Sequence, residues 1–138
     1  VNLLEQRERL RRRYSSMVGM DWDEITINNP DEEFLKKVVG IISDNLLNPD
    51  FNVGRLQAEM AISREHLYRK LMAICGEAPS SLIRKLRLKT AAAMILDGRE
   101  SITEIALHVG FSNPSHFARS FKKEYGISPH KYRKEPVT

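Results

Sequence analysis

The sequence has a single cysteine, Cys75, and no apolar run that approaches the roughly 20 residues of a membrane span. One cysteine excludes an internal disulfide and a cysteine-based zinc cluster, and it fits a reducing cytoplasm. The four histidines lack metal-ligand spacing, and neither a glycine-rich phosphate loop nor a Ser/His/Asp constellation is present. We therefore expect no metal, no cofactor and no catalytic residue, and we predict a protein that is not an enzyme.

Charge is unevenly divided along the 138 residues, whose 41% hydrophobic and 29% charged content is typical of one globular domain. Residues 1–50 hold 7 Lys/Arg against 10 Asp/Glu, a balance of −3, whereas residues 51–138 hold 15 against 8, a balance of +7. The overall charge of +4 therefore conceals a basic C-terminal part. Such an excess favours a polyanionic partner, although basic domains with other partners are also common.

Residues 102–125 have the pattern of two short helices joined by a tight turn. Ser101 and Glu104 can form a capping box at the start of the first helix. Gly110 breaks the pattern as a glycine does just past a helix end, and Ser112 is expected to cap the second helix. Apolar residues recur at helical spacing, at Ile102, Ile105, Ala106 and Val109 in the first helix and at Phe117, Phe121 and Tyr125 in the second.

A second copy of this pattern covers residues 53–75. The copies align at an offset of 49 residues as far as Ser63 and Ser112, and at an offset of 50 after one extra residue in the later copy. An internal repeat is stronger evidence than either copy alone. After the change of offset, the positions that align are His66 with His116, Leu67 with Phe117, Arg69 with Arg119, Leu71 with Phe121, Gly76 with Gly126, and Pro79 with Pro129.

A polar, cationic second helix after a tight turn is the helix-turn-helix arrangement that enters the DNA major groove. We predict an all-α fold in which two such units, at 53–75 and 102–125, are joined by a long linker helix at 79–97. A rigid linker would hold two recognition helices roughly 34 Å apart for successive major grooves. In that helix the inward candidates are Leu82, Ile83, Leu86, Leu88, Ala93 and Met94, and the outward candidates are Arg84, Lys85, Arg87 and Lys89.

Residues 1–29 are predicted to be a helix and a linker, and residues 30–138 a DNA-binding domain. The N-terminal helix has a weak heptad seam and could equally be the last helix of a preceding domain. The start of the chain is too charged for a signal peptide and has no initiator Met, so we expect a piece of a longer protein. Asn29 then caps a core-forming helix.

The run GFSNPSHFARSFKKEYGISPHKYR at residues 110–133, together with SREHLYRKL at residues 63–71, resembles the AraC-type (AraC/XylS) transcription regulators. The resemblance covers about residues 31–134. It implies a homeodomain-like DNA-binding domain of about seven helices. Such a domain reads adjacent major-groove segments of double-stranded DNA and contacts RNA polymerase, as an activator.

The run LLEQRERLRRRYS at residues 3–15 is similar to the junction after a receiver domain in hybrid two-component sensors of Bacteroides-like bacteria. This similarity implies a cytoplasmic output piece of a phosphorelay protein with upstream receiver and sensor domains, its full length anchored in the inner membrane. The cupin-like effector domain of other AraC-type regulators is absent, so we expect no small-molecule ligand. Affinity is expected to come from pairing of protomers, as a homodimer, on repeated half-sites.

The resemblance, carried over by position, implies which side chains meet DNA. Arginine can pair bidentately with guanine, asparagine with adenine, and glutamate can accept from cytosine. The base-reading candidates are Arg64, Glu65, Tyr68 and Arg69 in the first unit and Asn113, Ser115, His116 and Arg119 in the second. The phosphate candidates, which would govern the salt dependence of binding, are Lys122, Lys123, Lys131 and Arg133.

Other roles remain open for several of these side chains. Arg69 and Arg119 could clamp phosphates rather than read bases. His116 could support packing or contact a phosphate, and Glu65 could pair with Arg64 or Arg69 instead of a base.

Two rival functions would also fit parts of the sequence. A basic helical fold could be an adaptor for an acidic protein without DNA binding, but such an adaptor would not require two matched units at one rigid spacing. AraC-like helices also occur fused to DNA-repair methyltransferases that use a reactive cysteine. Cys75 lies at a predicted helix end without a zinc-binding cysteine set, and we interpret it as a buried small residue.

Overall fold

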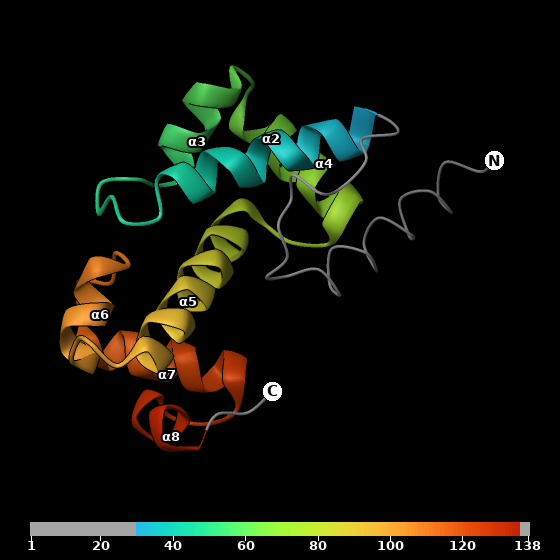
Figure 1. Ribbon diagram of the computed structural model, residues 1–138. Helices are drawn as coiled ribbons and strands as arrows, with labels where there is room; N and C mark the ends of the chain where they lie inside the picture. Colours follow the sequence, from blue (N-terminus) through green and yellow to red (C-terminus); the bar gives the residue numbers. More distant parts are fainter. Residues whose placement is uncertain (1–29, 136–138) are drawn as a thin grey trace. The chain divides into compact units, whose positions relative to one another are not determined.

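The computed structural model describes residues 30–135, which form seven helices and no strand (Figure 1). The predicted all-α class and the number of helices are confirmed. The expected helix and linker in residues 1–29 lie outside the described residues. The helices are α2 Pro30–Asp44, α3 Val53–Met60, α4 Arg64–Cys75, α5 Pro79–Asp97, α6 Ile102–His108, α7 Pro114–Tyr125 and α8 Pro129–Lys134.

The chain divides into two compact units. Within the described residues, the first unit holds residues 30–44 and 52–83, and the second holds residues 45–51 and 84–135. The helix pair α3–α4 lies in the first unit and the pair α6–α7 in the second. Helix α5 begins in the first unit and ends in the second, and the segment 45–51 between α2 and α3 belongs to the second unit.

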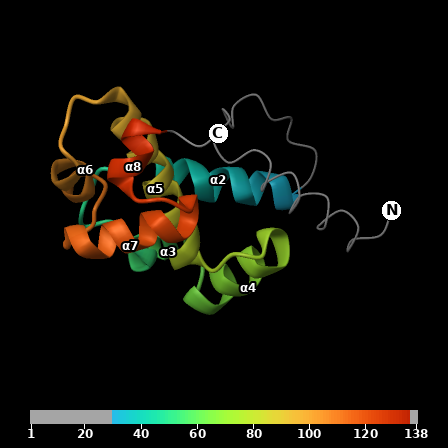
Figure 2. The ribbon, with the colours of Figure 1, turned by 90° about the horizontal axis from the view of Figure 1, so that it is seen from below.

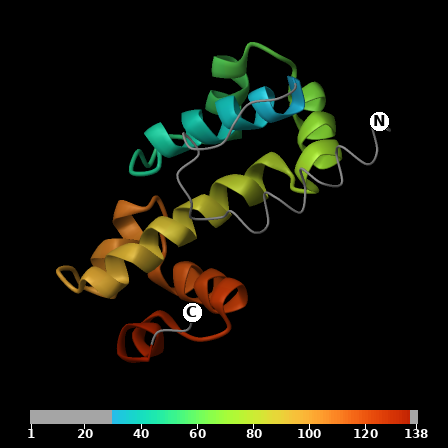
Figure 3. The ribbon, with the colours of Figure 1, turned by 45° about the vertical axis from the view of Figure 1, so that its right-hand side comes forward.

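The first unit is built on α2, which packs against α3 and α4 (Figures 1 and 3). The side chain of Asn52 caps α3, that of Ser63 caps α4, and Gly76 ends α4 in the left-handed conformation. The fully buried side chains of this unit include Leu35, Val38, Ile42, Leu56, Leu67, Leu71, Ile74 and Leu82.

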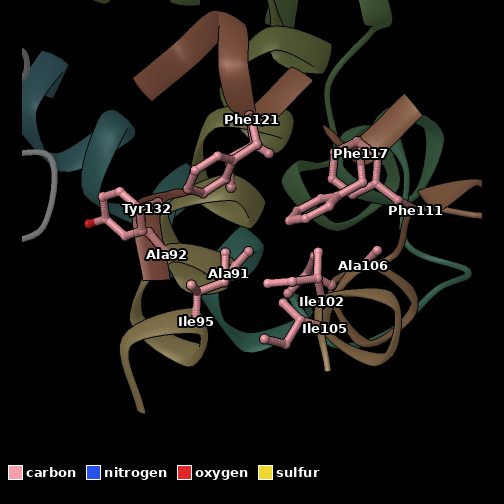
Figure 4. Packing of buried hydrophobic residues seen from close by; sticks show 12 residues of the cluster. Ala91, Ala92, Ile95, Ile102, Ile105, Ala106, Phe111, Phe117, Phe121 and Tyr132 are labelled. Atoms are coloured by element: carbon pink, nitrogen blue, oxygen red, sulfur yellow. The ribbon is translucent and has the colours of Figure 1, made fainter. Parts of the chain in front are cut away.

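The second unit has an aromatic core. Phe111, Phe117, Phe121 and Tyr132 point toward one another over Ala91, Ala92 and Ile95 of α5 (Figure 4), with ring centroids of successive pairs 5.3–5.8 Å apart. Figure 2 shows α6, α7 and α8 near the C-terminal part of α5. Burial of these large rings removes much apolar surface from water and so stabilises the unit.

The sequence prediction for α5 was wrong at several positions. Ala93 was expected to face inward but is exposed, whereas Ala91, Ala92 and Ile95 are buried. Arg87 and Lys89 were expected to face outward but are half-buried. Apolar residues lie almost all round this helix, so their spacing does not single out one buried face.

The internal repeat is retained in three dimensions. At the offset of 49, Leu56 and Ile105 are both fully buried; at the offset of 50, Leu67 and Phe117 are too. The extra residue falls inside the second turn. The N-cap of α7 is therefore Asn113, not Ser112 as predicted from the sequence. Its Oδ1 accepts hydrogen bonds from the backbone N–H groups of residues 115 and 116, at 2.8 and 3.3 Å.

The turn of the first unit holds Ala61 at φ 57°, where the second unit has Gly110 at φ 93°. An alanine in the left-handed region is strained by roughly 1–2 kcal/mol. We expect Ala61→Gly to raise the free energy of unfolding by about 0.5–1 kcal/mol, less than the strain because glycine gains entropy in the unfolded chain. Urea unfolding measures this free energy. The control Ala58→Gly, inside α3, is expected to lower it. A loss of stability in both variants would contradict the strain at Ala61.

Burial raises the pKa of Tyr125 from 10.0 to about 12, and the neighbouring Tyr132 and Glu124 add to the rise. The unfolded chain therefore loses this phenol proton first, so stability present below pH 10 is lost as the pH rises toward 12. Because the phenol is partly exposed, we expect a loss of no more than about 2 kcal/mol. The check is urea unfolding of the protein and Tyr125→Phe on both sides of pH 10. A pH-independent difference between the two would contradict the prediction.

Candidate nucleic-acid interface

Helix α4 presents one polar face to solvent. Leu67 and Leu71 are fully buried on one side, and all four predicted reading residues, Arg64, Glu65, Tyr68 and Arg69, are exposed. Glu65 and Arg69, one helical turn apart, form an exposed ion pair with 3.9 Å between Oε1 and Nε. The pairing left open for Glu65 is thus with Arg69, and an exposed pair of this kind contributes little to stability. This weak pair therefore leaves both side chains available to a ligand.

Helix α7 presents a more cationic face. Phe117 and Phe121 are fully buried on its inner side. The predicted contact residues Ser115, His116, Arg119, Lys122 and Lys123 are all exposed. Among residues 30–135, Arg119 has no ion-pair partner, so its guanidinium is available to a ligand. Lys122 and Lys123 lie in the last turn, where cations are also favoured by the helix dipole.

Two residues at the start of α7 already have structural partners. The Oδ1 atom of Asn113 accepts two backbone hydrogen bonds as the helix cap, which occupies both of its lone pairs. A bidentate pair with adenine needs that oxygen as an acceptor, so it would remove the cap. The ring of His116 packs edge-on against Phe111, with 5.4 Å between centroids, while its outer edge stays exposed.

Arg133 was predicted to contact phosphate, but the structure gives it another role. Its Nε donates to the carbonyl of Ile95 at 3.1 Å and its Nη2 to the carbonyl of Glu100 at 2.6 Å. The guanidinium thus satisfies carbonyl groups at and after the end of α5, which have no partner inside the helix. Lys131 remains exposed, on the short helix α8.

Arg87 is a polar residue whose role the sequence analysis missed. Its guanidinium donates to the carbonyls of Phe51 at 2.9 Å, Asn48 at 3.3 Å and Gly110 at 3.4 Å. Its Nε is buried without a partner among residues 30–135. Ile83 and Ala91, one helical turn before and after Arg87, are buried, and this spacing was the signal in the sequence that Arg87 faces protein.

Residues 30–135 hold no group of His, Cys, Asp and Glu able to bind a metal ion. Cys75 is buried, and its Sγ donates to the carbonyl of Leu71 at 3.3 Å. Within the same residues, no helix has the length and apolar character needed to cross a membrane.

The sequence profile of a helix-turn-helix domain matches residues 56–135, more than half of the chain. A crystal structure from Chromobacterium violaceum, of a transcriptional regulator described as AraC-type, has a TM-score of 0.71 at 26% identity, covering 80% of this chain and 100% of that one. The chain belongs to the AraC-type helix-turn-helix family. The family and its fold are those of DNA-binding transcription regulators, not of enzymes.

Other similarities cover different shares of the chain. Histidine kinase P4 of Formosa agariphila is 35% identical over 132 residues, 96% of this chain and 10% of that protein. The regulator MtrA of Neisseria gonorrhoeae is 34% identical over 86 residues, 62% of this chain and 29% of that protein. The DNA-binding domain of AdpA, solved with a target DNA, has a TM-score of 0.67 at 28% identity, covering 72% of this chain and 89% of that domain. The chain thus spans less than a third of the length of histidine kinase P4 and of MtrA.

Proposed function

We propose that this AraC-type domain binds double-stranded DNA by inserting α4 and α7 into neighbouring major-groove segments, and that it activates transcription. The observation that carries the proposal is the pair of matched helix faces. In both units, the second helix of the pair buries its apolar side and exposes arginine and other polar groups at equivalent positions. The similar AdpA domain, solved with a target DNA, supports it.

The side chains divide into three roles in this proposal: phosphate contact, capping of α7 and base reading. Lys122, Lys123 and Lys131 neutralise phosphates and set the salt dependence. Asn113 orients the start of α7 as its cap and leaves base reading to its neighbours. The base-reading set is Arg64, Glu65, Tyr68, Arg69, Ser115, His116 and Arg119, in which arginine prefers guanine and glutamate prefers cytosine.

We place the domain at the output end of a phosphorelay. The similarity to histidine kinase P4 spans 132 residues, and therefore extends beyond the helix-turn-helix region. In this proposal residues 1–29 end a preceding receiver domain, residues 30–138 bind DNA in the cytoplasm, and the upstream sensor is held in the inner membrane. Phosphorylation upstream pairs two protomers on repeated half-sites, where they contact RNA polymerase.

The test begins with selection of duplexes from a randomised library by this chain. Fluorescence anisotropy then compares the selected duplex with a shuffled duplex of the same length across a salt series. We expect tighter binding to the selected duplex and a steep fall in affinity with salt. Enrichment of no sequence, or equal binding to both duplexes at every salt concentration, would contradict sequence-specific DNA binding.

A further inference from the structure

Arg87 lies at the junction of three backbone segments of the second unit. From α5, its guanidinium reaches the carbonyls of Asn48 and Phe51 in segment 45–51 and that of Gly110 in the turn between α6 and α7. Burial lowers the pKa of Arg87, but a guanidinium stays charged at any physiological pH. Charged donors make stronger hydrogen bonds than neutral ones, so these contacts hold the three segments together.

The contact at Gly110 depends on the absence of a side chain there. A Cβ atom at this position would lie 2.3 Å from Nη1 of Arg87 and 2.7 Å from its Cζ. The guanidinium therefore rests directly against the backbone of the turn. Three residues later Asn113 caps α7, so the turn that Arg87 touches leads directly into the first residues of that helix.

Hydrogen bonds within segment 45–51 fix the position of the carbonyls that accept from Arg87. The N–H of Asn48 donates to the carbonyl of Asn45 at 3.0 Å, and the N–H of Phe51 donates to the carbonyl of Asn48 at 3.2 Å. The Oδ1 of Asn48 also accepts from the N–H of Asp50 at 3.0 Å, and the side chain of Phe51 is buried. These bonds fix a turn whose carbonyls face Arg87.

We propose that Arg87 is a positioning residue for DNA recognition: it ties the α6–α7 turn to segment 45–51 and so holds the reading end of α7 in place without touching DNA. The inference rests on the proposed reading role of α7. A planar fork with several donors fits three carbonyls, whereas a lysine ammonium is a single point charge. Small displacements of groups that make directional contacts are expensive, so losing the fork lowers base discrimination.

The experiment uses the selected and shuffled duplexes with Arg87→Lys, Arg87→Ala and the control Arg84→Ala, which removes an exposed arginine one turn earlier on α5. Circular dichroism and urea unfolding establish that each variant is folded. We expect Arg87→Lys to lower the ratio of affinities for the two duplexes about tenfold, which lies within the discrimination supplied by one bidentate base contact. Its salt dependence stays that of the parent protein, because no phosphate contact is lost. Arg84→Ala keeps the ratio.

Amide hydrogen exchange provides a readout without DNA. In Arg87→Lys we expect faster exchange in the turn at residues 109–113, with protection retained inside α6 and α7. An unchanged affinity ratio in a folded Arg87→Lys protein overturns the positioning role. So does an equal loss for both duplexes with a shallower salt dependence, which would mean a phosphate contact. If the parent protein itself prefers no sequence, the proposed function fails and this inference with it.

Discussion

Replacing Gly110 by alanine is expected to lower the free energy of unfolding by about 2–4 kcal/mol. Two effects add. The residue sits at φ 93°, where an alanine costs roughly 1–2 kcal/mol. The new Cβ would also lie 2.3 Å from Arg87, which has to move away and leave the carbonyls of Asn48 and Phe51 without their donor. Urea unfolding at neutral pH, with the free energy extrapolated to water, measures the loss.

Gly126 supplies a matched control for the backbone effect alone. It has a similar φ of 83°, but an added Cβ would meet nothing within 4 Å. We expect Gly126→Ala to cost only the strain of roughly 1–2 kcal/mol. In a double-mutant cycle, Gly110→Ala and Arg87→Ala should together cost less than the sum of the single changes, because the displaced group is already gone. An equal loss in the free energy of unfolding for the two glycine variants would mean that Arg87 does not contact the turn at Gly110.

The features of this fold that could be predicted are those that depend on residues close together in the sequence. The caps at Asn52, Ser63 and Ser101 were predictable because each uses a hydroxyl or amide within three residues of its N–H partner. The capping box was too, since the Ser101 hydroxyl donates to Oε1 of Glu104 at 3.1 Å. The buried residues of α4 and α7 followed from spacing, because those helices have one apolar face.

The wrong predictions arose where the local sequence is equally compatible with two arrangements. Ser112 and Asn113 are both good caps, and the extra residue of the second turn decides between them. The partners of Arg87 and Arg133 lie 23–39 residues away in the chain, so only the packed fold shows that these two arginines bind carbonyls. Surface position could be predicted for eleven of the twelve candidate contact residues, and the exception is the half-buried Arg133.

The role of each exposed arginine depends on the DNA it meets, and Arg119 is where a substitution should have the largest effect on recognition. It lies in the middle of α7, opposite Phe117 and Phe121, and no ion pair within residues 30–135 holds it. If it reads guanine bidentately, Arg119→Ala loses roughly 1–3 kcal/mol on the selected duplex and much less on the shuffled one. That is about a 5- to 150-fold loss of affinity confined to the preferred sequence.

Arg119→Lys separates reading from charge. The lysine keeps the positive charge but not the planar fork, so we expect the salt dependence to be retained and the preference to fall nearly as far as in Arg119→Ala. Lys122→Ala, one turn later on α7, is the matched phosphate variant; it should weaken both duplexes equally and reduce the salt slope by about 0.9. Anisotropy titrations of the three variants on both duplexes provide the comparison. If Arg119→Lys keeps the preference while Arg119→Ala behaves like Lys122→Ala, then Arg119 clamps a phosphate and recognition shifts to the Glu65–Arg69 pair of α4.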